Sequence, residues 1–258
     1  MQPTALITGA SSGIGLAFAR IFAKNNYNLV LVARNEVQLN ALAAELSHVT
    51  VTVIAKDLSQ NNAPQAIFEA LQAQHIVVNV LINNAGFGDF SLFHESNWAK
   101  QAQMIDLNIR ALTELTHLFG GAMVARRSGK ILNVASTAAF QPGPTMAVYY
   151  ATKHYVLAFS EAISNEMAEY GVVVSCLCPG ITASGFQAAA ALEESRLVKG
   201  KKMPTSEEVA EYGYKALMQG KTVAIHGWLN WAMANSVRFT PRAWVLKAVR
   251  FMQNRADA

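Results

Sequence analysis

The sequence predicts one α/β domain over residues 1–258, built on a mainly parallel, doubly wound sheet of seven strands with helices on both faces. Two observations predict this fold class. Apolar stretches of strand length alternate with longer stretches whose apolar residues recur at helical spacing. The strand-like stretches are apolar without interruption, as in parallel strands that are covered on both faces. No repeat or low-complexity linker divides the sequence, so we expect a single domain.

Each predicted element has its own sequence signal. The strands are stretches rich in β-branched residues, at residues 4–8, 29–33, 49–55, 77–83, 130–135, 172–178 and 222–225. The helices are stretches with apolar residues at helical spacing, at residues 14–24, 36–46, 63–74, 98–125, 148–170 and 206–218. Parallel strands need a crossover connection and a helix supplies it, so this order predicts repeated β-α-β units.

Composition narrows the functional class. Hydrophobic residues make up 52% of the chain and charged residues only 15%, which excludes a disordered protein. The net charge of +4 is small and spread along the chain, so we expect no nucleic-acid partner. Cys176 and Cys178 exclude a disulfide framework, and we expect small core residues there and no metal site. The sequence shows no signal peptide and no uncharged apolar run of about 18 residues, which predicts a cytoplasmic protein without a membrane span.

A glycine-rich turn follows the first predicted strand. Residues 8–15 read TGASSGIG and lead directly into the first predicted helix. Glycines at such a turn allow positive φ and a close approach to the backbone, and the helix N-terminus attracts an anion. We therefore expect a nucleotide pyrophosphate at this turn, held by Gly9, Ser11, Ser12, Gly13, Ile14 and Gly15.

The residue after the second predicted strand favours one cofactor over another. Sites for NAD place an acidic residue there, which accepts a hydrogen bond from the ribose 2′-hydroxyl. This sequence has Arg34 instead, whose guanidinium suits a 2′-phosphate. The pattern predicts NADP(H), and the alternative is a solvated arginine at the start of a helix.

Two side chains of one predicted helix are candidates for acid–base chemistry. Tyr149 and Lys153 are four residues apart, so both project from the same helix face. A free tyrosine has a pKa of about 10, and we expect the Lys153 ammonium and the positive nicotinamide ring to lower it. Tyr149 would then protonate the substrate oxygen while the cofactor delivers hydride to carbon. Tyr150 and His154 have the same spacing without the permanent cation, so we interpret Tyr150 as a packing neighbour.

These residues together resemble the short-chain dehydrogenases/reductases, a Rossmann-fold family, and in particular its NADP-preferring type. Ser136 follows the fifth predicted strand, where its hydroxyl can bind a carbonyl oxygen as charge develops. The resemblance extends over roughly residues 4–186, and its pieces are the glycine turn, Asp57, Asn83-Asn84-Ala85-Gly86, Asn108, Ser136, Tyr149-x-x-x-Lys153 and Pro179-Gly180.

The resemblance implies further roles for individual residues. Asp57 and Leu58 would contact the adenine, and Asn108 would hold a water that connects Lys153 to solvent. Lys153 itself would hold the ribose hydroxyls. The adenosine ribose would be lined by Asn84, Ala85 and Gly86. The nicotinamide would lie beside Pro179 and Gly180, with its amide on a hydroxyl residue that is either Thr182 or Ser184.

The C-terminal part of the sequence suggests a cover over the substrate and a basic tail. Residues 182–204 lie where the family keeps a substrate-covering lid, and apolar wall residues are expected at Phe140, Pro142, Met146 and Phe186. In the tail, residues 228–258, Thr240-Pro241 predicts a helix start with Thr240 as N-cap. An apolar stripe follows at Trp244, Val245, Ala248, Val249, Phe251 and Met252, beside Arg242, Lys247 and Arg250. This helix either packs on its own fold or across a homo-oligomer interface, or lies on an anionic membrane surface.

The sequence therefore predicts an NADP(H)-dependent oxidoreductase that interconverts a carbonyl and a secondary alcohol. The expected substrate is an apolar small molecule, lipid-like or a ketoacyl compound, and the expected assembly is a homodimer or homotetramer. Two alternatives remain open: a non-catalytic NADP(H)-binding regulator, and a lipid reductase that is peripheral to the membrane through its tail.

Overall fold

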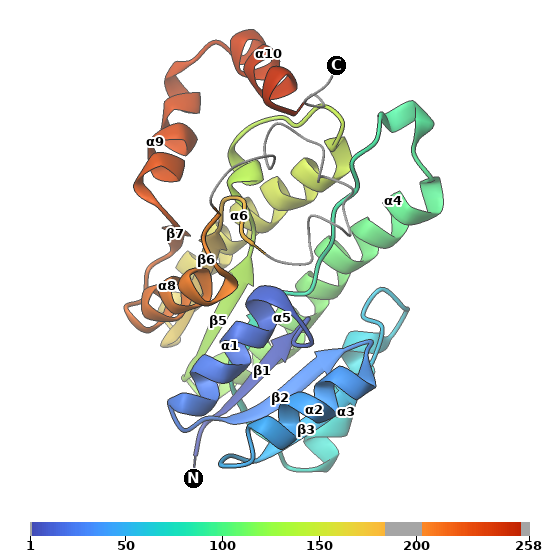
Figure 1. Ribbon diagram of the computed structural model, residues 1–258. Helices are drawn as coiled ribbons and strands as arrows, with labels where there is room; N and C mark the ends of the chain where they lie inside the picture. The colour runs from blue at the N-terminus through green and yellow to red at the C-terminus, as the bar shows by residue number, and fades with distance from the viewer. Residues whose placement is uncertain (1, 184–202, 254–258) are drawn as a thin grey trace.

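The computed structural model describes residues 2–183 and 203–253 and contains the predicted seven-stranded sheet. All strands run parallel, in the order β3-β2-β1-β4-β5-β6-β7 (Figure 1). They are β1 (Thr4–Thr8), β2 (Asn28–Ala33), β3 (Val51–Ala55), β4 (Val78–Asn83), β5 (Gly129–Val134), β6 (Val172–Cys178) and β7 (Val223–Ile225). The predicted doubly wound fold is thus confirmed, with strand ends within two residues of the expected positions.

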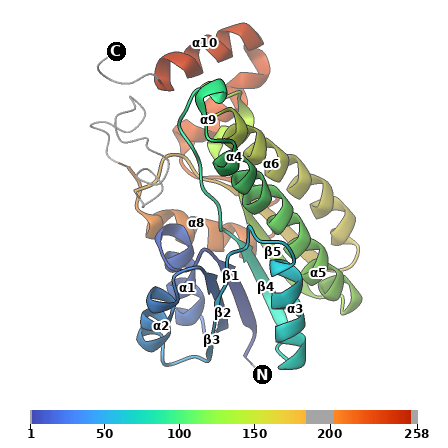
Figure 2. The ribbon, with the colours of Figure 1, turned by 90° about the vertical axis from the view of Figure 1, so that its right-hand side faces the viewer.

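Helices cover both faces of this sheet (Figure 2). One face holds α1 (Gly13–Lys24), α2 (Glu36–Glu45) and α8 (Ser206–Met218), and the other holds α3 (Ala63–Ala73), α5 (Leu112–Ala125) and α6 (Ala147–Ala168). Successive strand residues alternate between the two layers: Leu29 and Leu31 pack under α1 and α2, whereas Val30 and Val32 pack on the opposite side. This double burial explains why the strand sequences are apolar without interruption.

The helix predicted at residues 98–125 is continuous but contains one wide turn. It consists of α4 (Trp98–Ile105), the π-helical turn η2 (Asp106–Ala111) and α5. The wide turn carries Asn108, whose amide is buried and bonded to the backbone of Phe87. Such turns are frequent at functional sites. The helix thus widens where it presents a polar side chain to the sheet edge.

The strand order reverses next to β1, which pairs with β2 on one side and β4 on the other. The connections that leave β1 and β4 therefore diverge to opposite faces and leave a crevice at the carboxyl edge of the sheet. Every sequence-predicted site residue that the structure describes follows the carboxyl end of a strand or lies on a helix beside that edge.

The tail forms two short helices, α9 (Trp228–Ser236) and α10 (Arg242–Gln253). They lie at the end of the molecule toward which the carboxyl ends of the strands point (Figure 1). The predicted N-cap is wrong: Thr240 Oγ1 donates to Ser236 O at 2.9 Å, and the Pro241 carbonyl accepts the first helical bond from Val245 N. Of the expected apolar stripe, Val245 and Val249 are buried, whereas Trp244, Ala248, Phe251 and Met252 are exposed. Among the described residues, no helix is both long and apolar enough to cross a membrane.

Candidate active site

The glycine turn between β1 and α1 has the geometry that its sequence predicts. Gly9 and Gly13 have φ angles of 66° and 54°, which side chains rarely tolerate. A Cβ atom on Gly9 would lie 2.8 Å from Asn84 Nδ2, and one on Gly15 would collide with the Gly9 carbonyl. The turn is therefore folded tightly on itself and against the segment that follows β4, and only glycine fits these positions.

Thr8 links the connection that leaves β1 to the connection that leaves β4. Its hydroxyl accepts hydrogen bonds from the backbone N–H groups of Asn84 (2.9 Å) and Ala85 (3.0 Å). The Asn84 side chain completes the link, since its Nδ2 donates to Thr8 O at 2.9 Å. The predicted ribose-lining residues Asn84, Ala85 and Gly86 thus lie beside the glycine turn, and the Asn84 amide serves the turn itself.

The first turn of α1 suits an anion. Ser12 is the N-cap residue, but its side chain makes no capping hydrogen bond. The amides at the start of the helix are thus left for a ligand, and the helix dipole favours a negative charge there. Ser11 and Ile14 lie partly exposed in the same turn. The turn consequently fits the pyrophosphate that the sequence predicts.

Arg34 follows β2 at the same edge, and its side chain is exposed. The next residue, Asn35, caps α2 by accepting a hydrogen bond from Gln38 N at 3.1 Å. That cap fixes the turn, and neither of the two residues that directly follow β2, Arg34 and Asn35, is acidic. This arrangement fits a 2′-phosphate better than two free ribose hydroxyls.

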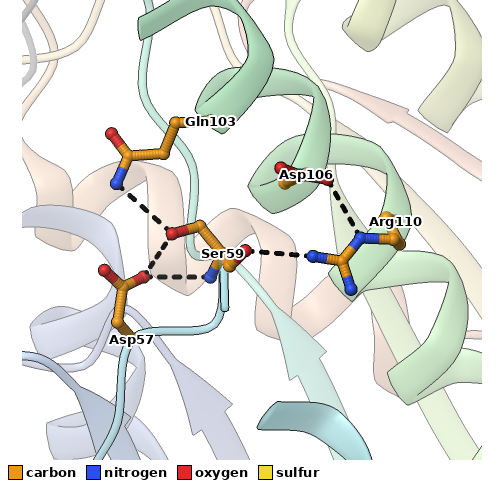
Figure 3. A network of polar contacts seen from close by, with 5 residues as sticks. All are labelled: Asp57, Ser59, Gln103, Asp106 and Arg110. Carbon is orange, nitrogen blue, oxygen red and sulfur yellow. Dashed lines mark hydrogen bonds and ion pairs between the residues drawn. The ribbon is translucent and has the colours of Figure 1, made fainter. Parts of the chain in front are cut away.

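Asp57 is held by a network that joins the end of β3 to the long helix (Figure 3). Its Oδ1 accepts from Ser59 N (2.9 Å) and Ser59 Oγ (2.7 Å). Gln103 and Arg110 of the long helix bind Ser59 in turn, and Asp106 pairs with Arg110 at 3.0 Å. The network orients Asp57 and leaves Oδ2 without a partner among the described residues, while the neighbouring Leu58 is buried. Sequence reasoning missed Ser59, Gln103 and Arg110, which carry no motif.

Ser136, Tyr149 and Lys153 meet beyond the carboxyl end of β5. Ser136 begins the short 3₁₀ turn η3 (Thr137–Phe140), where its Oγ accepts from Ala138 N at 3.1 Å. The Ser136 side chain lies close enough to the Tyr149 hydroxyl to lower the pKa of that phenol. Lys153 Nζ lies 5.7 Å from the centroid of the Tyr149 ring and donates to the Val134 carbonyl at 2.9 Å. The structure thus brings together three of the four residues that the sequence predicts for catalysis, the fourth being Asn108, and adds a backbone acceptor that no side-chain pattern could indicate.

Burial dominates the acid–base properties of this cluster. Burial raises the pKa of Tyr149 above its usual value, the Ser136 side chain lowers it, and the neighbouring Tyr150 raises it further. Burial lowers the pKa of Lys153 to about 8. In the protein without cofactor the loss of surrounding water has the largest effect on the pKa of Tyr149 and raises it, and the lowering expected from Lys153 together with the bound nicotinamide ring stays a prediction.

Asn108 lies beside this cluster and is tightly held. Its side chain donates to Phe87 O (3.0 Å) and Thr152 Oγ1 (3.2 Å), and it accepts from Phe87 N (3.2 Å). A Cβ atom on Gly86 would lie 2.9 Å from Asn108 Oδ1 and 3.6 Å from Lys153 Nζ. The two side chains thus border the same glycine. The water that the resemblance implies between them stays a prediction.

The remaining predicted residues lie around the end of β6. The Pro179 carbonyl accepts from Thr137 N at 2.8 Å, and Thr182 is buried with its hydroxyl bonded to the Gly180 carbonyl at 3.0 Å. Ser184, the alternative to Thr182, lies outside the described residues, as do Phe186 and most of the predicted lid at residues 182–204. The two cysteines are free and buried, as expected.

Tyr150 takes the packing role that the sequence assigns to it. Its ring meets the Tyr149 ring edge-on at 6.1 Å between centroids, and its backbone carbonyl contacts His154 Nδ1. Burial raises the pKa of Tyr150 to about 12, and the Gln253 side chain of α10 opposes this rise. Sequence reasoning missed Gln253, which is fully buried at the end of the tail helix.

Comparison with known proteins identifies the family. The family model described as short chain dehydrogenase matches residues 3–195. The chain belongs to the short-chain dehydrogenase family. The predicted resemblance is thus confirmed, and the protein is a short-chain dehydrogenase/reductase of the oxidoreductase class.

Two similar curated proteins carry names that refer to a 3-oxoacyl-CoA reductase and to a hydroxysteroid dehydrogenase. A very-long-chain 3-oxoacyl-CoA reductase-like protein of Arabidopsis thaliana is 36% identical over 183 residues, which are 68% of this chain and 58% of the relative. Hydroxysteroid dehydrogenase-like protein 1 of Gallus gallus is 31% identical over 223 residues, 83% of this chain and 65% of the relative. The chain therefore spans less than two thirds of the length of these curated relatives.

A solved structure matches this short-chain dehydrogenase over nearly its whole length. It is a short-chain dehydrogenase from Sphingobium yanoikuyae in complex with NADPH, with a TM-score of 0.82 and 30% sequence identity. The match covers 99% of this chain and 98% of the other.

Proposed function

We propose that this short-chain dehydrogenase is an NADP(H)-dependent enzyme that interconverts a carbonyl and a secondary alcohol. The single observation that carries the proposal is that Ser136, Tyr149 and Lys153 lie together at the carboxyl edge of the sheet. The same edge holds the glycine turn, where no side chain caps the first turn of α1. The end of β2 is separated from the end of β5 by β1 and β4. At the usual strand spacing this edge is about 14 Å long, which suits an extended dinucleotide.

The choice of NADP(H) over NAD(H) rests on Arg34. A positive side chain at the end of β2 favours the phosphorylated ribose, and no acidic residue stands there to bind an unmodified one. The related structure that binds NADPH supports the same choice. Asp57 Oδ2 and the buried Leu58 would hold the adenine, and the first turn of α1 the pyrophosphate.

In the proposed reduction, bound NADPH supplies hydride to the carbonyl carbon. Residues of the protein bind the carbonyl oxygen and protonate it. Because the Ser136 side chain lies near the Tyr149 hydroxyl, a carbonyl oxygen placed between the two would receive a hydrogen bond from each. Tyr149 then gives its proton to the oxygen. A protonated Lys153, held by the Val134 carbonyl, stabilises the phenolate that remains.

We propose an apolar, lipid-like substrate. Tyr149 belongs to a hydrophobic cluster with Met104, Ala138, Met146 and Tyr150. Such surroundings favour a substrate that brings few polar groups other than its carbonyl. The names of the two relatives, a 3-oxoacyl-CoA reductase-like protein and a hydroxysteroid dehydrogenase-like protein, support the same class.

A panel of long-chain 3-oxoacyl thioesters, ketosteroids and simple ketones, followed by NADPH absorbance, tests this function. We expect turnover with NADPH and higher kcat/KM for the larger apolar carbonyls than for acetone-like ketones. NADPH binding without turnover on any member of the panel would favour a non-catalytic regulator. A homo-oligomer is proposed on family grounds, and light scattering of the purified protein tests it.

A further inference from the structure

Large apolar side chains stand exposed along both tail helices. Trp228 and Trp231 of α9 expose 81% and 59% of their surface, and Trp244 and Phe251 of α10 expose 68% and 64%. Phe239, in the link between the helices, exposes 88%. We call the exposed face of residues 228–253 the tail surface. Clustered exposed aromatic groups on this scale are typical of an interaction site.

The charges of the tail surface all have one sign. It carries Arg238, Arg242, Lys247 and Arg250, all of them exposed. Residues 228–253 include no aspartate or glutamate. Exposed tryptophan and phenylalanine among basic residues match the boundary of an anionic lipid layer, where rings enter the headgroup region and cations meet lipid phosphate and carboxylate.

The underside of the same helix is fixed to the candidate active site. Val245 and Val249 are buried in the cluster that holds Tyr149, Tyr150 and Met104. Figures 1 and 2 both show α10 at the end of the molecule above α6, beyond the carboxyl edge of the sheet. The tail helix α10 is thus anchored by two valines, while Trp244 and Phe251 of the same helix remain largely exposed.

A second copy of the chain fits this surface less well. A symmetric dimer places the same patch against itself, so the arginines and lysine of one copy would face those of the other. No acidic residue of the tail surface could offset that repulsion. An anionic lipid layer removes the conflict, because it brings negative charge and accepts aromatic groups.

We infer that the tail surface docks the protein on anionic lipid membranes and holds the carboxyl edge of the sheet toward the lipid. Docking on the membrane does not require that the protein is catalytically active. Its use in taking an apolar substrate from the membrane rests on the proposed function. Each basic residue near an anionic surface contributes about 1 kcal/mol, which is about a fivefold change in binding.

Vesicle binding by the full chain tests the inference. Purified protein is mixed with vesicles of phosphatidylcholine alone, or of equal parts phosphatidylcholine and phosphatidylserine, and then sedimented. We expect binding to the anionic vesicles, weakening as salt rises, with a blue shift of tryptophan emission because three of the four tryptophans lie on the tail surface. Absence of binding to anionic vesicles, or equal binding to both kinds, would overturn the inference.

Paired variants separate docking from folding. Lys247→Glu with Arg250→Glu should weaken binding to anionic vesicles more than twentyfold, since each change removes an attraction and adds a repulsion. Trp244→Ser with Phe251→Ser should weaken it and reduce the blue shift, which Trp228 and Trp231 still report. The matched controls are Lys24→Glu, at the far end of α1, and Val77→Ser, just before β4, both exposed at the amino edge of the sheet. Both controls should bind as the unchanged protein does.

Two further measurements keep the outcomes distinct. Far-ultraviolet circular dichroism and light scattering are recorded for every variant. If Trp244→Ser with Phe251→Ser dissociates an oligomer and leaves vesicle binding intact, the tail surface is an interface between copies and the inference fails. Vesicle binding is measured without cofactor or substrate, so its result does not depend on catalysis. A protein that binds anionic vesicles but turns over no substrate would refute the proposed function and would not contradict the docking inference.

Discussion

Lys153 Nζ lies 5.7 Å from the centroid of the Tyr149 ring, and both side chains are buried, one turn apart on α6. The ammonium points past the ring to the Val134 carbonyl at the end of β5. A buried amine and a buried phenol in one small space disfavour charge on each, which explains why burial raises the pKa of Tyr149 and lowers the pKa of Lys153 to about 8. The protein without ligand therefore keeps Tyr149 as a neutral phenol, whose proton is available to a bound oxyanion.

Replacement of Lys153 should change how stability depends on pH. The folded pKa of about 8 is below the unfolded value of 10.5, so between these values the unfolded chain binds more protons. The unfolding free energy of the unchanged protein should therefore rise from pH 8 to pH 10 relative to that of Lys153→Met, by about 1 kcal/mol per pH unit. Urea unfolding across this range measures the difference. A flat or falling difference would mean that Lys153 is not destabilised in its charged form.

Replacement of Arg34 should change the cofactor preference. Arg34→Glu removes the cation and adds a group that repels a 2′-phosphate and accepts from a ribose hydroxyl. NADPH affinity should fall by about tenfold to a hundredfold, in line with the loss of a charge-assisted hydrogen bond, and NADH affinity should hold or rise. Fluorescence titration of both cofactors measures this, with Lys24→Glu as the charge control. Equal loss for NADPH and NADH would show that Arg34 does not contact the 2′-position.

Substitution in the glycine turn should lower stability as well as cofactor binding. Gly9→Ala adds a methyl group 2.8 Å from Asn84 Nδ2 at a φ of 66°, and we expect a loss of about 1–3 kcal/mol. Gly121→Ala, on an open helix face of α5 with nothing within 4 Å, should instead gain up to about 1 kcal/mol. Thermal unfolding and NADPH titration compare the two variants. If Gly9→Ala unfolds at the same temperature as the unchanged protein, the turn is less tightly folded than its contacts indicate.

Much of the fold followed from local patterns, and its exceptions arise from long-range contacts. Strands such as residues 29–33 are apolar along their whole length because both faces are covered, so their uninterrupted apolar sequence was enough to locate them. The wide turn at Asn108 depends on Phe87 and Thr152, which are distant in sequence. No local pattern encodes such contacts.

The candidate site divides in the same way. Motif residues such as Tyr149 and Ser136 were predicted, because their chemistry needs particular side chains at particular strand ends. The Val134 carbonyl and the Ser59 network were not, since backbone groups and ordinary polar residues carry no signature. The opposing effect of burial on the Tyr149 pKa was not predicted, because burial is a property of the packed structure.

The role of Tyr149 as proton donor is the central claim, and one comparison tests it most directly. Steady-state turnover with NADPH and a carbonyl from the panel is measured for Tyr149→Phe and for Tyr150→Phe, a neighbouring tyrosine that is equally buried. We predict that Tyr149→Phe lowers kcat by about 10²–10⁴-fold with NADPH affinity within about twofold, whereas Tyr150→Phe keeps most of its turnover. Turnover of Tyr149→Phe at the level of the unchanged protein would contradict the account.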